Sequence, residues 1–249
     1  MPELNRANRQ VCDLDIRNLK TGKPFMFFET ANVTTVGLES DSVYAMAKGT
    51  RRIAFPNPIT GTLSVEAQVY TFKFFSLFSD GTIDTSATIA KHETIKATEA
   101  GKITLVPGDG NTISAGFVFV YPKGDYGNED ALVAGSFAEN VFTATDASGI
   151  AVGSEYEVGY LLVKAGVKKI SFNNKKLPTD YFITMSTLDK DEEGLFTPFI
   201  ITAYKASIQR SWELSFNSEG DPASVTATFD LMEDKDGNIL DMVEDSEAE

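Results

Sequence analysis

Two short acidic segments carry the residue types of a calcium-binding loop. In residues 189–194, acids occupy loop positions 1, 3 and 5 and glycine occupies position 6, as in an EF-hand. The bidentate glutamate that an EF-hand needs at position 12 is replaced by Ile200, and the flanks alternate like strands. In residues 234–238 the glycine already stands at position 4. Both segments therefore favour hairpin turns, and we expect no metal site.

The residue types of nucleophilic catalysis are sparse. Cys12 is the one cysteine and His92 the one histidine of the 249 residues. A reactive thiolate needs a base and an electropositive setting, whereas Asp13 adjoins Cys12. We therefore expect a structural thiol at Cys12 and a surface or interface position for His92. No phosphate-binding, dinucleotide-binding or nucleophile-elbow motif is present. The sequence thus predicts no catalytic residues, no cofactor and no enzyme.

The chain is strongly acidic, and its charged residues are unevenly distributed along the sequence. There are 36 acidic and 22 basic residues, a net charge of −14. Such a chain is poorly suited to bind nucleic acid phosphates or an anionic membrane. Residues 124–163 contain seven acids and no lysine or arginine. Within them, Glu155 and Glu157 stand two apart on a predicted strand and so share one face, with Tyr156 and Val158 facing the core.

Period-two alternation of apolar and polar residues dominates the chain and predicts many short strands. It is clearest in residues 63–69, 113–121, 211–216 and 225–231, and Ile113, Phe117 and Phe119 should share one face. Further strands are expected at residues 13–18, 33–39, 52–55, 88–95, 156–164, 168–173, 181–188 and 199–208. One short helix is predicted over residues 71–78, where Tyr70, Phe74 and Phe78 are spaced four apart. The fold class is therefore mainly β: an antiparallel sandwich or barrel with one short helix.

The expected organisation has three parts. Residues 1–10 form an N-terminal arm without the apolar stretch of a secretory signal. Residues 11–232 form a β-rich domain with an elaborated middle region at about 85–165, and residues 163–169 are the best candidate for an internal boundary. Residues 233–249 form a turn and an acidic tail. The tail proper, residues 244–249, is short, like-charged and without apolar anchors, so it should be dispensable for folding.

Two stretches resemble tail tube (major tail) proteins of phages that infect Gram-positive bacteria. The first runs from Tyr44 to Gly49, through Ile53–Phe55, to residues 60–68. The second comprises residues 216–222, 229–231 and 236–238. The matching parts cover roughly residues 40–80 and 200–243. The resemblance rests on strands and turns, so it carries no catalytic signature.

The resemblance implies a virion structural protein, assembled in the host cytoplasm and located in the tail. Its subunits would form hexameric rings that stack into a hollow tube, with other tail proteins as partners and no membrane partner. Viral DNA would pass through without specific binding, and Glu155 and Glu157 would be candidates to face the lumen. The alternatives are another virion component, such as a decoration or tail-tip protein, and a β-sandwich module for surface binding or adhesion.

Overall fold

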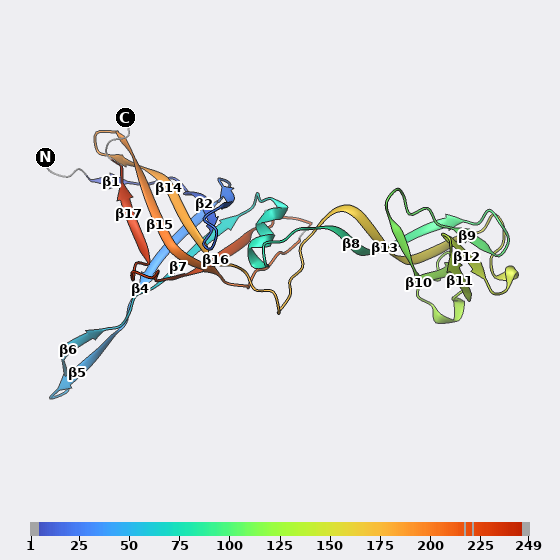
Figure 1. Ribbon diagram of the computed structural model, residues 1–249, viewed down its shortest axis with the longest axis horizontal. Coiled ribbons are helices and arrows are strands. Elements are labelled where there is room, and N and C mark those ends of the chain that lie inside the picture. Colours follow the sequence, from blue (N-terminus) through green and yellow to red (C-terminus); the bar gives the residue numbers. More distant parts are fainter. Residues whose placement is uncertain (1–4, 217, 221, 246–249) are drawn as a thin grey trace. The chain divides into compact units, whose positions relative to one another are not determined.

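The structure, a computed structural model, describes residues 5–216, 218–220 and 222–245. It confirms the predicted fold class: the chain is mainly antiparallel β, arranged in several sheets (Figure 1). None of the sheets in the described part closes into a barrel, so the arrangement is consistent with a β-sandwich. The chain divides into two compact units. Unit 1 comprises Met1–Thr82 and Ser171–Glu249, and unit 2 comprises Ile83–Ile170.

Unit 1 is built on a nine-stranded sheet whose main path runs β3-β2-β14-β15-β16-β7-β4, with β1 added to β14 and β17 added to β15. The strands are β1 (Arg6–Ala7), β2 (Asp13–Asn18), β3 (Pro24–Phe28), β4 (Val33–Glu39), β7 (Thr60–Ala67), β14 (Tyr181–Asp191), β15 (Phe196–Ile208), β16 (Val225–Met232) and β17 (Leu240–Glu244). A separate hairpin joins β5 (Ser42–Ala47) to β6 (Thr50–Pro56).

The alternating residues of β7 and β16 explain the core of unit 1. Leu63 and Val65 of β7 are buried, and so are Ala227 and Phe229 of the neighbouring strand β16, with which they pair in register. Their polar neighbours lie on the opposite face, as a period of two requires. The buried residues of both strands belong to one cluster that also contains Phe74 of the helical segment.

The predicted helix is present, but its type differs from the expectation. It is a 3₁₀ helix, η1 (Phe72–Phe78), rather than an α-helix with four-residue spacing. Three residues per turn still bring Phe74, Leu77 and Phe78 to the buried side. At its C-terminal end, Asp80 accepts a hydrogen bond from the Thr82 hydroxyl at 2.6 Å and pairs with Lys176 at 3.0 Å. These contacts lower the pKa of Asp80 to about 2.

Two predicted strands are wrong. Residues 211–216 alternate in sequence but form no strand, because Trp212 packs its ring on Phe75 and Phe78 of η1 instead, at 5.3 and 6.1 Å between centroids. Of residues 168–173, only the first two are in a strand, at the end of β13. Aromatic packing at Trp212 in the first segment, and the end of the β13 ladder at Lys169 in the second, therefore overrode local alternation.

Unit 2 contains two three-stranded sheets that share one core. The first is β10 (Thr112–Pro122), β13 (Glu155–Lys169) and β8 (Asp84–Lys96), and the second is β11 (Gly135–Ala138), β12 (Val141–Ala144) and β9 (Lys102–Thr104). The short turns η2 (Glu129–Ala131) and η3 (Ala147–Gly149) lie between strands. Val120 and Val158 of the first sheet and Ile103 of the second are fully or almost fully buried in this core.

The single apolar face expected for residues 113–121 is also wrong. A register shift between Ile113 and Val118 interrupts the pairing of β10 with β13. Such a bulge moves the following residues to the opposite face. Ile113 and Val118 are therefore buried, whereas Phe117 and Phe119 are about half exposed.

Both ends of the described chain lie against the sheet of unit 1. Arg6 and Ala7 pair with Asp191 and Lys190, and Arg6 forms an ion pair with Glu244. Glu244 ends strand β17, so it is not part of a solvated tail as expected, and Asp245 donates its N–H to the Pro198 carbonyl at 3.0 Å. Residues 1–4 of the predicted arm and 246–249 of the predicted tail lie outside the described residues.

Candidate assembly surfaces

The β5–β6 hairpin, residues 42–56, is the most exposed structured element of unit 1; we call it the hairpin arm. Every residue from 43 to 56 is exposed, and in the described chain β5 and β6 pair only with each other. Its turn, Lys48-Gly49, has positive φ values of 47° and 77°. Two successive left-handed residues are what a tight two-residue hairpin turn requires.

One face of the hairpin arm is apolar. Val43 pairs with Phe55 and Ala45 with Ile53, so these four side chains lie on the same side. Val43 is 60% exposed, and Ile53 and Phe55 are each 56% exposed. An isolated two-stranded hairpin is marginally stable in water, and a contiguous exposed apolar patch is typical of an interaction surface. The exposed apolar face therefore makes the hairpin arm a candidate interaction surface.

The ladder that leads into the hairpin arm is continuous with the main sheet. Glu39 of β4 pairs with Thr60 of β7, and Asn57 donates its N–H to the Asp41 carbonyl at 2.8 Å. The Ser40 hydroxyl also donates to the Asn57 carbonyl at 2.8 Å. These bonds fix the direction in which the hairpin arm leaves β4 and β7.

A second feature, which we call the cross-sheet groove, crosses the outer face of the sheet in unit 1. It has a volume of about 1,070 Å³ and crosses β2, β14, β15, β16 and β7 near one end of each. Its apolar lining includes Leu19, Ile59, Phe182, Met232 and Ile239, and its charged lining comprises Asp180, Glu233, Asp234, Lys205 and Lys235.

Hydrogen bonds order the side chains around the cross-sheet groove. Tyr204 packs edge-on against Phe182 with 6.1 Å between ring centroids, and its hydroxyl donates to Asp241, which raises the pKa of Tyr204. Asp234 accepts the N–H groups of Asn238 and Asp236 at 2.9 and 2.8 Å, and these bonds lower its pKa. Residues 234–238 are thus a turn, but not the hairpin turn that was predicted, because β16 and β17 on either side both pair with β15 and not with each other.

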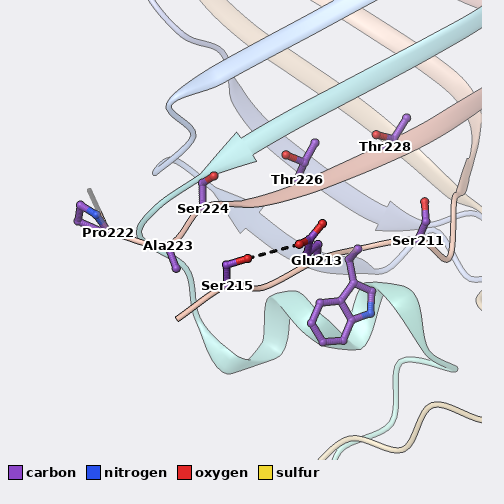
Figure 2. A pocket seen from close by; sticks show the side chains of 9 residues that line it. Ser211, Glu213, Ser215, Pro222, Ala223, Ser224, Thr226 and Thr228 are labelled. Carbon is purple, nitrogen blue, oxygen red and sulfur yellow. Dashed lines mark hydrogen bonds between the residues drawn. The ribbon is translucent and has the colours of Figure 1, made fainter. Parts of the chain in front are cut away.

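A third surface is the polar groove of about 670 Å³ shown in Figure 2. Thr226 and Thr228 of β16 lie across it from Glu213 and Ser215 (Figure 2). The Ser215 hydroxyl donates to the Glu213 carboxylate at 3.4 Å. Hydroxyls and one carboxylate offer hydrogen bonds to a polar ligand.

Glu155 and Glu157 lie on β13 of unit 2, and Tyr156 and Val158 between and after them are buried as predicted. Lys123, immediately before the acidic block, pairs with Glu155 at 2.5 Å. This charge-assisted hydrogen bond lowers the pKa of Glu155 and raises that of Lys123. Glu157 accepts the Gly124 N–H at 3.3 Å. The negative charge of Glu155 is therefore largely offset by Lys123.

The remaining residues that we singled out take structural positions. Residues 189–194 include the end of β14 and its turn into β15, where Asp191 accepts the Leu195 N–H at 2.8 Å. Cys12 is half-buried, and burial, then Asp13 and Asp189, raise the pKa of its thiol. His92 is exposed in unit 2 and stacks on Tyr126 with 4.1 Å between centroids. In the part of the chain that is described, no group of metal-ligating side chains gathers and no helix is long and apolar enough to span a membrane.

The exposure of the hairpin arm was not predicted from the sequence. Alternating apolar residues on both sides of Lys48-Gly49 were a usable hairpin signal. That signal predicts which residues of the two strands pair with each other. It does not predict that neither strand pairs with a third strand. The cross-sheet groove was missed because its lining comes from five strands that are distant in sequence.

Comparison with known proteins identifies the family. The model of the YomU/Tube protein family matches residues 9–244, which include the hairpin arm, the cross-sheet groove and all of unit 2. Among curated proteins, no relative matches the chain. Asn217 and Asp221, two residues of the family-like stretch at 216–222, lie outside the described residues. A match over almost the entire chain shows that the protein belongs to the YomU/Tube family and is a phage tail tube protein, a structural component of the virion.

Proposed function

We propose that this chain associates with copies of itself into stacked hexameric rings, and that the resulting tube is the conduit for the phage genome. The observation that carries this proposal is the hairpin arm. Its apolar face consists of Val43, Ala45, Ile53 and Phe55, and it has no partner within the described chain. Membership of a tail tube family supports the proposal, because a tube requires contacts between copies of its subunit.

Association through a protruding arm also suits the energetics of the fold. The core clusters of the two units contain no residue of the hairpin arm, so neither core requires it. Covering the arm in an assembly removes apolar surface from water at no cost to the subunit core. Assembly would therefore depend on the arm while the folded subunit would not.

The test is electron microscopy and sedimentation of the purified protein over a range of concentrations. We expect rings or tubes, either spontaneously or after addition of a tail-initiating complex. A species that stays monomeric under all these conditions, the initiating complex included, refutes self-assembly.

We further propose that Glu155 and Glu157 face the space through which DNA moves. Carboxylates repeated around a ring would repel phosphates, so that the genome slides without sticking. Because Lys123 offsets Glu155, Glu157 should contribute more of this repulsion.

We predict that Glu157→Lys, and the double variant with Glu155→Lys, assemble normally but slow genome ejection. A charge-matched double variant, Glu129→Lys with Asp130→Lys, is the control, since both residues are exposed in the same acidic block. The measurement is the rate of genome ejection from purified particles. Normal ejection from fully assembled Glu157→Lys particles would place this residue outside the lumen.

A further inference from the structure

We infer that the cross-sheet groove of one subunit is the docking site for the hairpin arm of a second copy of the chain. This inference rests on the proposed self-assembly and names the surface that receives the arm. Three independent matches between arm and groove support it: length, apolar surface and charge.

The lengths agree. The groove crosses five neighbouring strands, β2, β14, β15, β16 and β7, and four inter-strand spacings of about 4.8 Å give a span of about 19 Å. Strand β5 has six residues, which at about 3.3 Å each extend about 20 Å. An arm laid across the sheet would therefore fill the groove from Leu19 at one end to Ile59 at the other.

The apolar surfaces agree as well. The arm presents Val43, Ile53 and Phe55 on one face, each more than half exposed. The groove presents Leu19 and Ile59, which are 39% and 50% exposed, together with the partly buried rings and side chains of Phe182, Tyr204 and Met232. Two incompletely buried apolar surfaces of similar extent would cover each other on docking.

The charges are opposite. Residues 42–56 contain Lys48, Arg51 and Arg52 and no acid, in a chain whose net charge is −14. The groove is lined by Asp180, Glu233 and Asp234 against two lysines, and residues 230–241 carry five acids against Lys235 alone. Complementary potentials of this kind favour and orient association.

The arm cannot occupy the groove of its own chain. The bond from Asn57 to Asp41 and the pairing of Glu39 with Thr60 join the arm to β4 and β7 as one ladder. Only two residues separate Pro56 from Ile59. The arm could therefore fold back onto the outer face of its own sheet only if these bonds were broken. The occupant is therefore a second copy.

A charge-swap experiment tests the inference. One variant carries Arg51→Glu and Arg52→Glu in the arm, a second carries Asp180→Lys and Glu233→Lys in the groove, and a third carries all four changes. Asp234 is left intact because it stabilises its turn. We expect each double variant to need at least about tenfold more protein for assembly, because two rim ion pairs are lost in each. The fourfold variant should recover to within about threefold of wild type.

The control and the outcomes separate this inference from the proposed function. A matched variant, Asp109→Lys with Glu129→Lys, changes two exposed acids of unit 2 and should assemble as wild type does. If the wild type and the groove variant assemble equally well, or if the fourfold variant recovers nothing, docking in this groove is overturned while self-assembly stands. If the wild type never assembles, both proposals fail.

Discussion

Removing the two largest side chains from the apolar face of the hairpin arm should strongly weaken assembly without weakening the subunit. The perturbation is the double variant Ile53→Ser with Phe55→Ser. Both residues are 56% exposed and lie outside the two buried clusters. Substitution at such surface positions changes the free energy of unfolding by about 0.5 kcal/mol or less. The thermal midpoint of the variant should therefore match that of the wild type.

The effect on association follows from the area still available for burial. Complete burial of a Phe or Ile side chain stabilises by about 1.5–3 kcal/mol, and roughly half of that remains to be gained here. The two side chains together contribute about 2 kcal/mol to each contact between subunits. At about 1.4 kcal/mol per factor of ten, their loss weakens each contact about 30-fold. Because a tube repeats the contact many times, the concentration required for assembly should rise at least as steeply.

Sedimentation velocity measures the assembled fraction, and circular dichroism measures the thermal midpoint of the same sample. Leu177→Ser is the control, because Leu177 is 67% exposed in unit 1 but lies outside the arm. Unchanged assembly of the double variant would refute the reasoning, since the arm would then contribute no buried surface. A lower thermal midpoint would show instead that the arm stabilises the subunit itself.

Three further outcomes can be checked by thermal melts. Deleting residues 246–249 should leave the midpoint unchanged, whereas deleting residues 240–249 removes strand β17 and should lower it by several degrees. Asp80→Asn should flatten the acid side of the plot of unfolding free energy against pH. The pKa of Asp80 in the folded state is depressed to about 2, so its stabilising contribution is present above about pH 4 and is lost as the pH falls toward 2. That contribution is about 0.5–1 kcal/mol, because solvent screens the pair. Gly159→Ala should destabilise unit 2, because a Cβ there would lie 2.0 Å from the Tyr126 hydroxyl oxygen. Adding Tyr126→Ala should restore part of the lost stability. Equal thermal midpoints for the Gly159→Ala variant and the wild type would contradict this packing.

Several strands of the main sheet could be predicted from the sequence alone, among them the edge strand β4 and the central strands β7 and β16. Val33–Glu39 was expected with its observed bounds, and the buried positions of β7 and β16 follow directly from their pattern. Alternation failed where pairing was interrupted. The bulge after Ile113 reverses the faces of β10, and residues 211–216 alternate without any ladder because aromatic packing on η1 fixes Trp212.

The assembly surfaces were harder to predict because exposure is a property of the whole fold. The sequence of the hairpin arm is that of an ordinary half-buried hairpin, and only the absence of a third strand in the described structure makes its apolar face a contact surface. Similarly, Lys123 lies one residue before the acidic block, so sequence separation hid its pairing with Glu155 across 32 residues. The expected elaboration at about 85–165 overlaps unit 2, Ile83–Ile170, but its origin as an insertion stays a prediction.

The way unit 2 begins and ends has a consequence for how such subunits can change. Asp84 near its start pairs in the ladder with Lys169 near its end, and their side chains form an ion pair at 3.3 Å. The chain thus leaves unit 1 and returns to it through two points that are close together, whatever lies between them. A tight turn could close the same gap, and so could a domain of a different size, without altering the strand order of unit 1. We therefore expect unit 2 to be exchangeable as a module, with the strand order of the nine-stranded sheet unchanged.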